Sequence, residues 1–138
     1  MKETTLNTLV IAVLATALVN LSSCEKDEGK LPNIAFKTTN GYTHSDASVS
    51  SGATVLVGIT ASKSEEEDVL KTFNVSKSVD GAAATTISNT TLTGSQGDSY
   101  DTDYTITAGA AGHTEKWLFT VTNRDGLTNT VSFTLTVN

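Results

Sequence analysis

The sequence predicts an all-β fold, a sandwich of two antiparallel sheets with about seven strands. Valine, threonine and serine dominate the chain from residue 33 onward, and such residues favour strands and turns over helices. Apolar residues recur there with a period of two, which indicates strands that bury one face. Asp-Gly and Asn-Gly pairs stand between the periodic runs, and short strands separated by such turns are typical of a sandwich.

Runs with a period of two cover residues 33–37, 54–61, 69–79, 100–108, 115–123 and 127–137. The last run is the clearest, because Val131, Phe133 and Leu135 alternate with serine and threonine. In the third run Lys71 and Lys77 interrupt the apolar pattern. We therefore expect an edge strand or a β-bulge at that place.

Turn signals separate these runs. Asp80-Gly81 and Asp125-Gly126 predict tight turns, because Asp-Gly accommodates the positive φ angles of a hairpin. Further turns or loops are marked by Asn40-Gly41, Ser51-Gly52 and residues 109–112. The acidic run from Glu65 to Asp68 predicts a solvated loop, because four adjacent like charges cannot all face inward. Its functional alternative is contact with a partner that has a basic patch.

The first residues have the pattern of an export signal. Lys2 precedes an apolar run over residues 9–19, whose eleven residues would rise only about 16 Å as a helix, against roughly 30 Å of membrane hydrocarbon. That length fits a signal peptide better than a membrane span. Leu21-Ser22-Ser23-Cys24, which follows, resembles the bacterial lipobox. The resemblance implies cleavage before Cys24 and three acyl chains on it, which hold a protein stably on a membrane.

Glu25-Lys26-Asp27-Glu28 follows the predicted lipidated cysteine. With Lys26, Asp27 and Glu28, it resembles the export signal of surface lipoproteins in Bacteroidota. The resemblance implies an outer-membrane protein that faces the cell exterior. The periplasmic face of that membrane is the second expectation, since a charged run can also be a simple solvated tether.

The chain thus divides into three predicted parts. Residues 1–23 are the lipoprotein signal peptide, residues 24–31 are the lipidated cysteine and an acidic tether, and residues 32–138 are the β domain. The final predicted hairpin, residues 114–137, resembles the last two strands of bacterial immunoglobulin-like and PKD-like surface domains. This resemblance implies an immunoglobulin-like sandwich.

Composition excludes several functions. The formal net charge of −6 opposes binding to nucleic acid and to anionic lipid headgroups. Cys24 is the only cysteine, so no disulfide can form within the chain. His44 and His113 have no zinc-binding spacing, and no Gly-x-Ser-x-Gly elbow is present. The sequence therefore predicts a protein that is not an enzyme and has no cofactor besides its covalent lipid.

Aromatic residues are the candidates for ligand binding. Tyr42, Tyr100 and Tyr104 lie at turns or beside carboxylates, where a tyrosine can stack on a sugar. The alternative is an ordinary strand tyrosine with its ring directed inward. Trp117 shares a face with Phe119 and is expected in the core.

Acidic residues supply the candidate metal ligands. Asp98, Asp101 and Asp103, together with Glu115, are the best calcium candidates, because Ca²⁺ takes six to eight oxygen ligands. Asp101 and Asp103 would lie about 7 Å apart on one strand face. The alternative is a negatively charged face that contacts only solvent.

Together these features predict a non-enzymatic lipoprotein whose domain binds or assembles with an extracellular protein, through a sheet edge or the loops at one end. One alternative is a glycan-binding accessory lipoprotein of a polysaccharide-uptake system. Another is a structural spacer.

Overall fold

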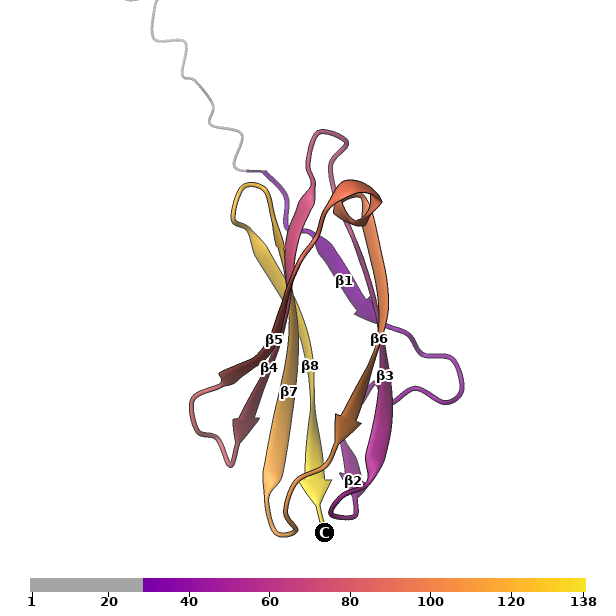
Figure 1. The fold of residues 1–138 in the computed structure, drawn as a ribbon, viewed down its shortest axis with the longest axis vertical. Helices are drawn as coiled ribbons and strands as arrows, with labels where there is room; N and C mark the ends of the chain where they lie inside the picture. The colour runs from indigo at the N-terminus through magenta and orange to yellow at the C-terminus, as the bar shows by residue number, and fades with distance from the viewer. Residues whose placement is uncertain (1–28) are drawn as a thin grey trace, which may run out of the picture.

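A computed structural model describes residues 29–138 (Figure 1), and the predicted signal peptide and the residues Cys24, Lys26, Asp27 and Glu28 lie outside them. The elements are β1 (Asn33–Phe36), β2 (Ala47–Val49), β3 (Thr54–Ser62), β4 (Leu70–Val79), β5 (Thr85–Thr91), the 3₁₀ turn η1 (Gly94–Gly97), β6 (Ser99–Thr107), β7 (Thr114–Asn123) and β8 (Thr128–Val137). Within residues 29–138 no helix has the length and apolar character that a membrane crossing needs.

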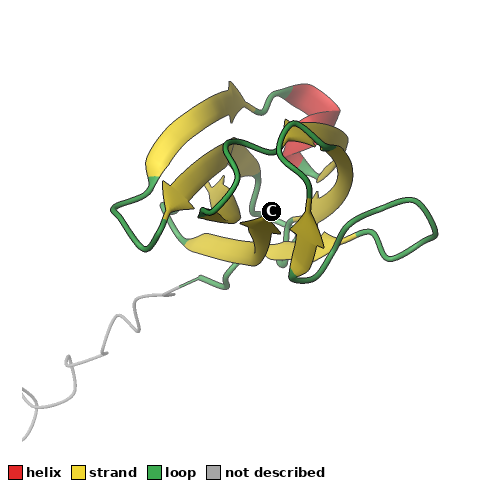
Figure 2. Ribbon diagram, turned by 90° about the horizontal axis from the view of Figure 1, so that it is seen from below, coloured by secondary structure: helices red, strands yellow, loops and turns green. Residues whose placement is uncertain are grey.

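The predicted all-β sandwich is confirmed. One sheet has the strand order β1-β3-β6, and the other has the order β2-β8-β7-β4-β5. Figure 2, a view from below, shows the two layers facing each other. Every pair is antiparallel except β2 and β8, which run parallel, with Ala47 beside Leu135. This parallel pair differs from the prediction, and it arises because the chain changes sheets between β1 and β2.

All six predicted runs are strands, and two further strands were not predicted. β2 is too short to show a period, and β5 has a single large apolar side chain, Ile87. Both turn predictions are confirmed. Asp80 and Gly81 have φ angles of 51° and 78°, and Gly126 has a φ of 81°.

Of the two lysines of β4, Lys71 marks a bulge, as one of the two expectations had it, and Lys77 does not. β4 lies between β7 and β5, so it is not an edge strand. Its register with β7 shifts between Leu70 and Thr72, which leaves Lys71 as the extra, exposed residue. Lys77 stays near the inner face, where its Nζ lies 3.1 Å from Oε1 of Glu115 on β7.

The core lies between the sheets and is centred on Phe119, which is fully buried. Its ring lies 5.9 Å from Phe36, 6.0 Å from Tyr104 and 6.3 Å from Phe133, centroid to centroid. Phe36 and Tyr104 come from the three-stranded sheet, so these contacts join the two layers. Trp117 is buried as well, which confirms its predicted place in the core.

The acidic run is only partly solvated. Glu66 and Glu67 are exposed as expected, but the expectation is wrong for Asp68, which is buried. Asp68 accepts hydrogen bonds from Nδ2 of Asn123 (2.7 Å) and from the backbone N–H of Val69 (2.7 Å). A charged group can be buried when such partners replace its water.

Candidate functional site

Three of the predicted site residues meet on the outer face of the three-stranded sheet. They are Tyr42, Asp101 and Asp103, and Lys37 joins them. We call these four residues the Lys37 cluster. No pattern in the sequence pointed to Lys37, which lies 64 residues before Asp101.

Strand register builds the Lys37 cluster. Asp103 on β6 lies opposite Gly58 on β3, and the backbone N–H of Lys37 donates to the carbonyl oxygen of Gly58 (2.8 Å). Lys37, Gly58 and Asp103 therefore form one row across three strands. A Cβ atom on Gly58 would lie only 2.5–2.8 Å from side-chain carbons of Lys37. Glycine thus leaves the space through which the lysine reaches β6.

Lys37 supplies the positive charge between the two aspartates. Its Nζ donates to Oδ1 of Asp101 (2.5 Å) and to Oδ1 of Asp103 (2.8 Å). The hydroxyl of Tyr42 donates to Oδ2 of Asp103 (3.0 Å), and Nζ of Lys37 lies 5.5 Å from the tyrosine ring centroid. The last distance is within the range of a cation–π contact.

These contacts shift the pKa values of three groups. The hydrogen bonds to Asp101 and Asp103 raise the pKa of Lys37. The hydrogen bond from Lys37 lowers the pKa of Asp103, while partial desolvation opposes the change. The pKa of Tyr42 is raised, chiefly because its hydroxyl donates to Asp103. Each shift favours the protonation state in which Lys37 is positive, Asp103 is negative and Tyr42 is neutral.

An apolar residue borders the Lys37 cluster. Leu56 is the outward position on β3 that precedes Gly58, and 38% of its surface is exposed. The loop of residues 38–46 passes beside it, since the N–H of Thr43 donates to the carbonyl oxygen of Leu56 (2.8 Å). Figure 1 shows this loop projecting from the side of the sandwich. We call the Lys37 cluster and Leu56 together the candidate patch.

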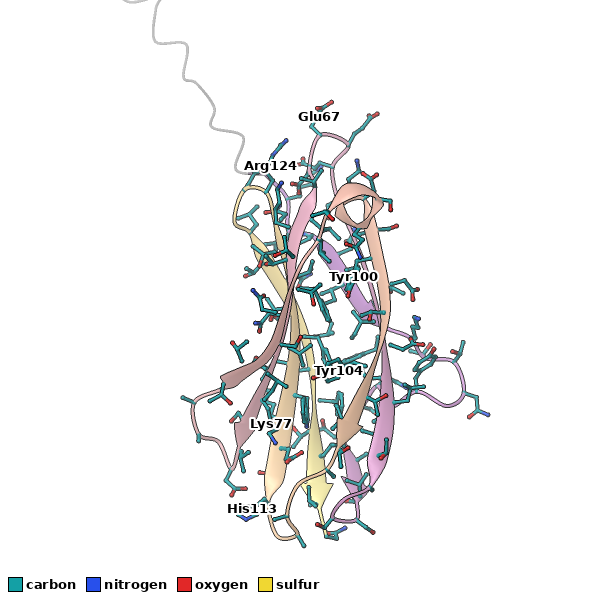
Figure 3. All side chains as sticks on the ribbon, viewed as in Figure 1. Glu67, Lys77, Tyr100, Tyr104, His113 and Arg124 are labelled. Carbon is teal, nitrogen blue, oxygen red and sulfur yellow. The ribbon has the colours of Figure 1, made fainter. Side chains whose placement is uncertain are left out.

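The two other predicted tyrosines point inward. The ring of Tyr100 lies 5.3 Å from that of Phe73, and the ring of Tyr104 lies 6.3 Å from that of Trp117. Figure 3 shows both tyrosines in the space between the two sheets. Of the two expectations for Tyr100 and Tyr104, the strand tyrosine with its ring directed inward is therefore the one that holds. Their positions on β6 alternate with Asp101 and Asp103, so the two kinds of side chain leave on opposite faces.

The four acidic calcium candidates lie in three separate places. Asp101 and Asp103 share Lys37, while Oδ1 of Asp98 lies 2.7 Å from Nζ of Lys63. Glu115 is buried in the sandwich. In the part of the chain that the structure describes, no three His, Cys, Asp or Glu side chains are grouped so that they could hold a metal ion.

Glu115 belongs to a polar group that was not among the sequence predictions. Its Oε1 accepts from Nζ of Lys77 (3.1 Å) and from the N–H of Gly109 (3.2 Å), and its Oε2 accepts from Nε1 of Trp117 (3.2 Å). Nζ of Lys77 also lies 5.3 Å from the indole ring. A signal was present in the sequence, because Lys77 and Glu115 are both charged residues aligned with the apolar positions of their strands.

The two histidines lie apart from each other, and only His113 lies apart from the candidate patch. Nδ1 of His113 lies 2.6 Å from Oδ2 of Asp80, at the end of the sandwich opposite residue 29. Nδ1 of His44 lies 3.3 Å from the carbonyl oxygen of Tyr42.

Comparison with family models and with curated proteins finds no match. Among solved structures, the superoxide reductase (neelaredoxin) of Ignicoccus hospitalis matches with a TM-score of 0.52 and 9% identity, over 79% of this chain and 81% of that chain. A variant of the same protein matches with a TM-score of 0.55 and 8% identity, over 84% of this chain and 86% of that chain. At such low identity these likenesses show the fold alone.

Proposed function

We propose that this chain is a non-enzymatic outer-membrane lipoprotein that faces the cell exterior. Its immunoglobulin-like domain binds an extracellular protein through the candidate patch. The observation that carries the binding proposal is the exposed Leu56 beside Tyr42 and three charged side chains. An exposed apolar side chain next to a tyrosine and charged groups has the composition of a protein interface.

The charge of the candidate patch indicates which side chains the partner presents to it. The Lys37 cluster has two carboxylates and one ammonium group, and its carboxylates are the more exposed groups. The side chain of Asp101 is 67% exposed and that of Asp103 is 46% exposed, against 20% for Lys37. An arginine or lysine of the partner would therefore complement the candidate patch, as it would the net charge of −6.

The glycan-binding alternative has less support. A sugar platform needs exposed aromatic rings, and Tyr100 and Tyr104 have their rings between the sheets. Tyr42 alone remains near the surface, and Lys37 lies over its ring.

Cross-linking in intact cells tests the partner. Wild type is compared with a Leu56→Asp/Asp101→Lys variant and with a Ser132→Asp control, which changes an exposed residue of the other sheet. We expect wild type and control to enrich the same surface protein at least tenfold over the patch variant. Equal enrichment from all three would contradict binding through the candidate patch.

Two measurements test the anchor and the location. Metabolic labelling with a fatty-acid analogue should mark the wild-type protein and leave a Cys24→Ala variant unlabelled. Protease added to intact cells should cleave wild type and spare a variant with Lys26, Asp27 and Glu28 changed to alanine. If both proteins are protected until the outer membrane is opened, the domain faces the periplasm.

A further inference from the structure

The described chain begins with a segment that the domain holds by its backbone. The carbonyl oxygens of residues 30, 31 and 32 each accept a side-chain hydrogen bond from a different part of the fold. The donors are Asn123 Nδ2 for Lys30 (3.2 Å), Ser64 Oγ for Leu31 (2.5 Å) and Asn129 Nδ2 for Pro32 (2.9 Å). We call these three hydrogen bonds the tether clamp.

The tether clamp has a rigid base. Asn123 is buried, and its Oδ1 accepts from the backbone N–H groups of Asp125 (3.2 Å) and Leu127 (2.8 Å). Nζ of Lys30 also lies 3.5 Å from Oε1 of Glu65. Pro32 is fully buried. The segment before β1 is therefore part of the domain from about residue 30 onward, and this shortens whatever free chain precedes it.

The shortening is large if Cys24 holds the lipid. From Cys24 to Gly29 the chain can span at most about 18 Å. If the chain were free up to β1, the span to Asn33 would be about 32 Å. The tether clamp therefore nearly halves the distance by which the domain can rise from the bilayer.

The clamped end of the sandwich exposes charges of both signs. Glu66, Glu67, Asp98 and Asp125 are exposed there together with Lys30 and Arg124, and Figure 3 shows Glu67 and Arg124 near the point where the described chain begins. The candidate patch lies between the two ends of the sandwich, because Asp101 and Asp103 stand in the middle of β6 and this strand runs along the long axis (Figure 1). It therefore faces sideways from a domain that is held close to the membrane.

We propose that the partner of the candidate patch is a protein embedded in or anchored to the same membrane. The candidate patch contacts this protein sideways, at the distance from the bilayer that the tether clamp sets. This inference rests on the proposed lipid anchor and on the candidate patch. A partner in the same membrane is confined to that height, so a short tether raises its effective concentration at the patch. A soluble partner gains nothing from the tether.

The first experiment tests the tether clamp and does not depend on lipid. Trypsin cleavage after Lys30 is followed by mass spectrometry in the full chain in detergent. A Ser64→Ala/Asn129→Ala variant should be cleaved there at least ten times faster than wild type. A Thr120→Ala/Thr130→Ala control, which removes the hydroxyl contact between β7 and β8 (2.8 Å), should match wild type. Equal cleavage rates in all three proteins would overturn the clamp.

The second experiment tests the partner, with a photoreactive p-benzoylphenylalanine replacing Leu56 in intact cells. Three forms are compared: the native tether, a tether with twelve Gly/Ser residues inserted between Glu28 and Gly29, and a secreted form without the lipid signal. We expect a discrete adduct with the native tether and at least fivefold less with the other two. An undiminished adduct in the secreted form would overturn the same-membrane partner and leave the binding function intact. No adduct in any form would overturn the candidate patch itself.

Discussion

Gly58 is the residue on which the geometry of the Lys37 cluster depends. Lys37 on the β1 side and Asp103 on β6 are separated by β3, and only a position without a side chain lets the lysine cross. Gly58 has no positive φ, so its role is close approach and not backbone freedom.

We predict that Gly58→Ala destabilises the domain by about 1–3 kcal/mol, because the new methyl group overlaps Lys37 and displaces it from both aspartates. The loss should be smaller in a Lys37→Ala background, where the outer carbons of the lysine are gone. Urea unfolding of the two single variants and the double variant measures this coupling. Gly97→Ala is the control, since a Cβ atom there would meet its neighbours at ordinary contact distances of 3.5–3.7 Å. Additive effects would show that Gly58 does not act through Lys37.

Asp80 gives the domain a sensitivity to acid. The hydrogen bond with His113 lowers the pKa of Asp80 below its ordinary value of 3.8, and the backbone N–H of Thr114 (2.8 Å) adds to this. A lowered carboxyl pKa contributes stability that is present above 3.8 and is lost as the pH falls through the folded-state value.

We therefore predict that wild type loses more stability than Asp80→Asn when the pH falls from about 5 to about 2.5. Asparagine tolerates the positive φ of 51° at this position, so the comparison isolates the charge. Chemical unfolding at a series of pH values measures the difference. Parallel stability curves would show that the bond between Asp80 and His113 adds nothing.

At the scale of elements, β5 is the edge strand with the least evident protection against pairing with a strand of another molecule. It ends the five-stranded sheet, and no charged residue lies between Gly81 and Gly97. Its register with β4 shifts between Val75 and Ser76, which leaves Ile87 as the extra residue, 47% exposed. A bulge twists an edge and interrupts its hydrogen-bonding row, which discourages pairing with another sheet.

Deletion of Ile87 should restore a regular ladder between β4 and β5 and leave a flatter, uncharged edge. We predict stronger self-association than in wild type, seen as a concentration-dependent rise in mass by sedimentation. Ile87→Ala keeps the bulge and should behave as wild type. If the deletion variant and wild type sediment alike, the bulge does not protect this edge.

At the scale of the whole molecule, Phe119 joins the two layers. It comes from β7 and packs against Phe36 and Tyr104 of the opposite sheet, as well as against Phe133 and Phe73 of its own. We predict that Phe119→Ala costs about 3–5 kcal/mol, because the other rings cannot close the cavity. Leu118→Ala, on the outer face of the same strand, should cost clearly less, since Leu118 is half-buried. Urea unfolding compares the two, and similar losses would contradict the central role of Phe119.

Only part of the candidate site could be predicted from the sequence. The alternation of Tyr100 and Tyr104 with Asp101 and Asp103 predicts that the two pairs separate to opposite faces, and the tyrosines share the period of Ile106, which favours them as the inward pair. The structure agrees, because Ile106 is buried. Burial of that larger apolar surface between the sheets outweighs any advantage of exposing the rings.

What the sequence determined by itself is local. A period of two over six runs and Asp-Gly between them specify strands and turns, since neighbouring residues along a strand point to opposite faces whatever the strand pairs with. What only the tertiary structure decided depends on the register between distant strands. Lys37 meets Asp101 across 64 residues, and Asn123 holds Lys30 across 93. No local pattern encodes such pairs, because sheet order and the sheet change between β1 and β2 bring them together.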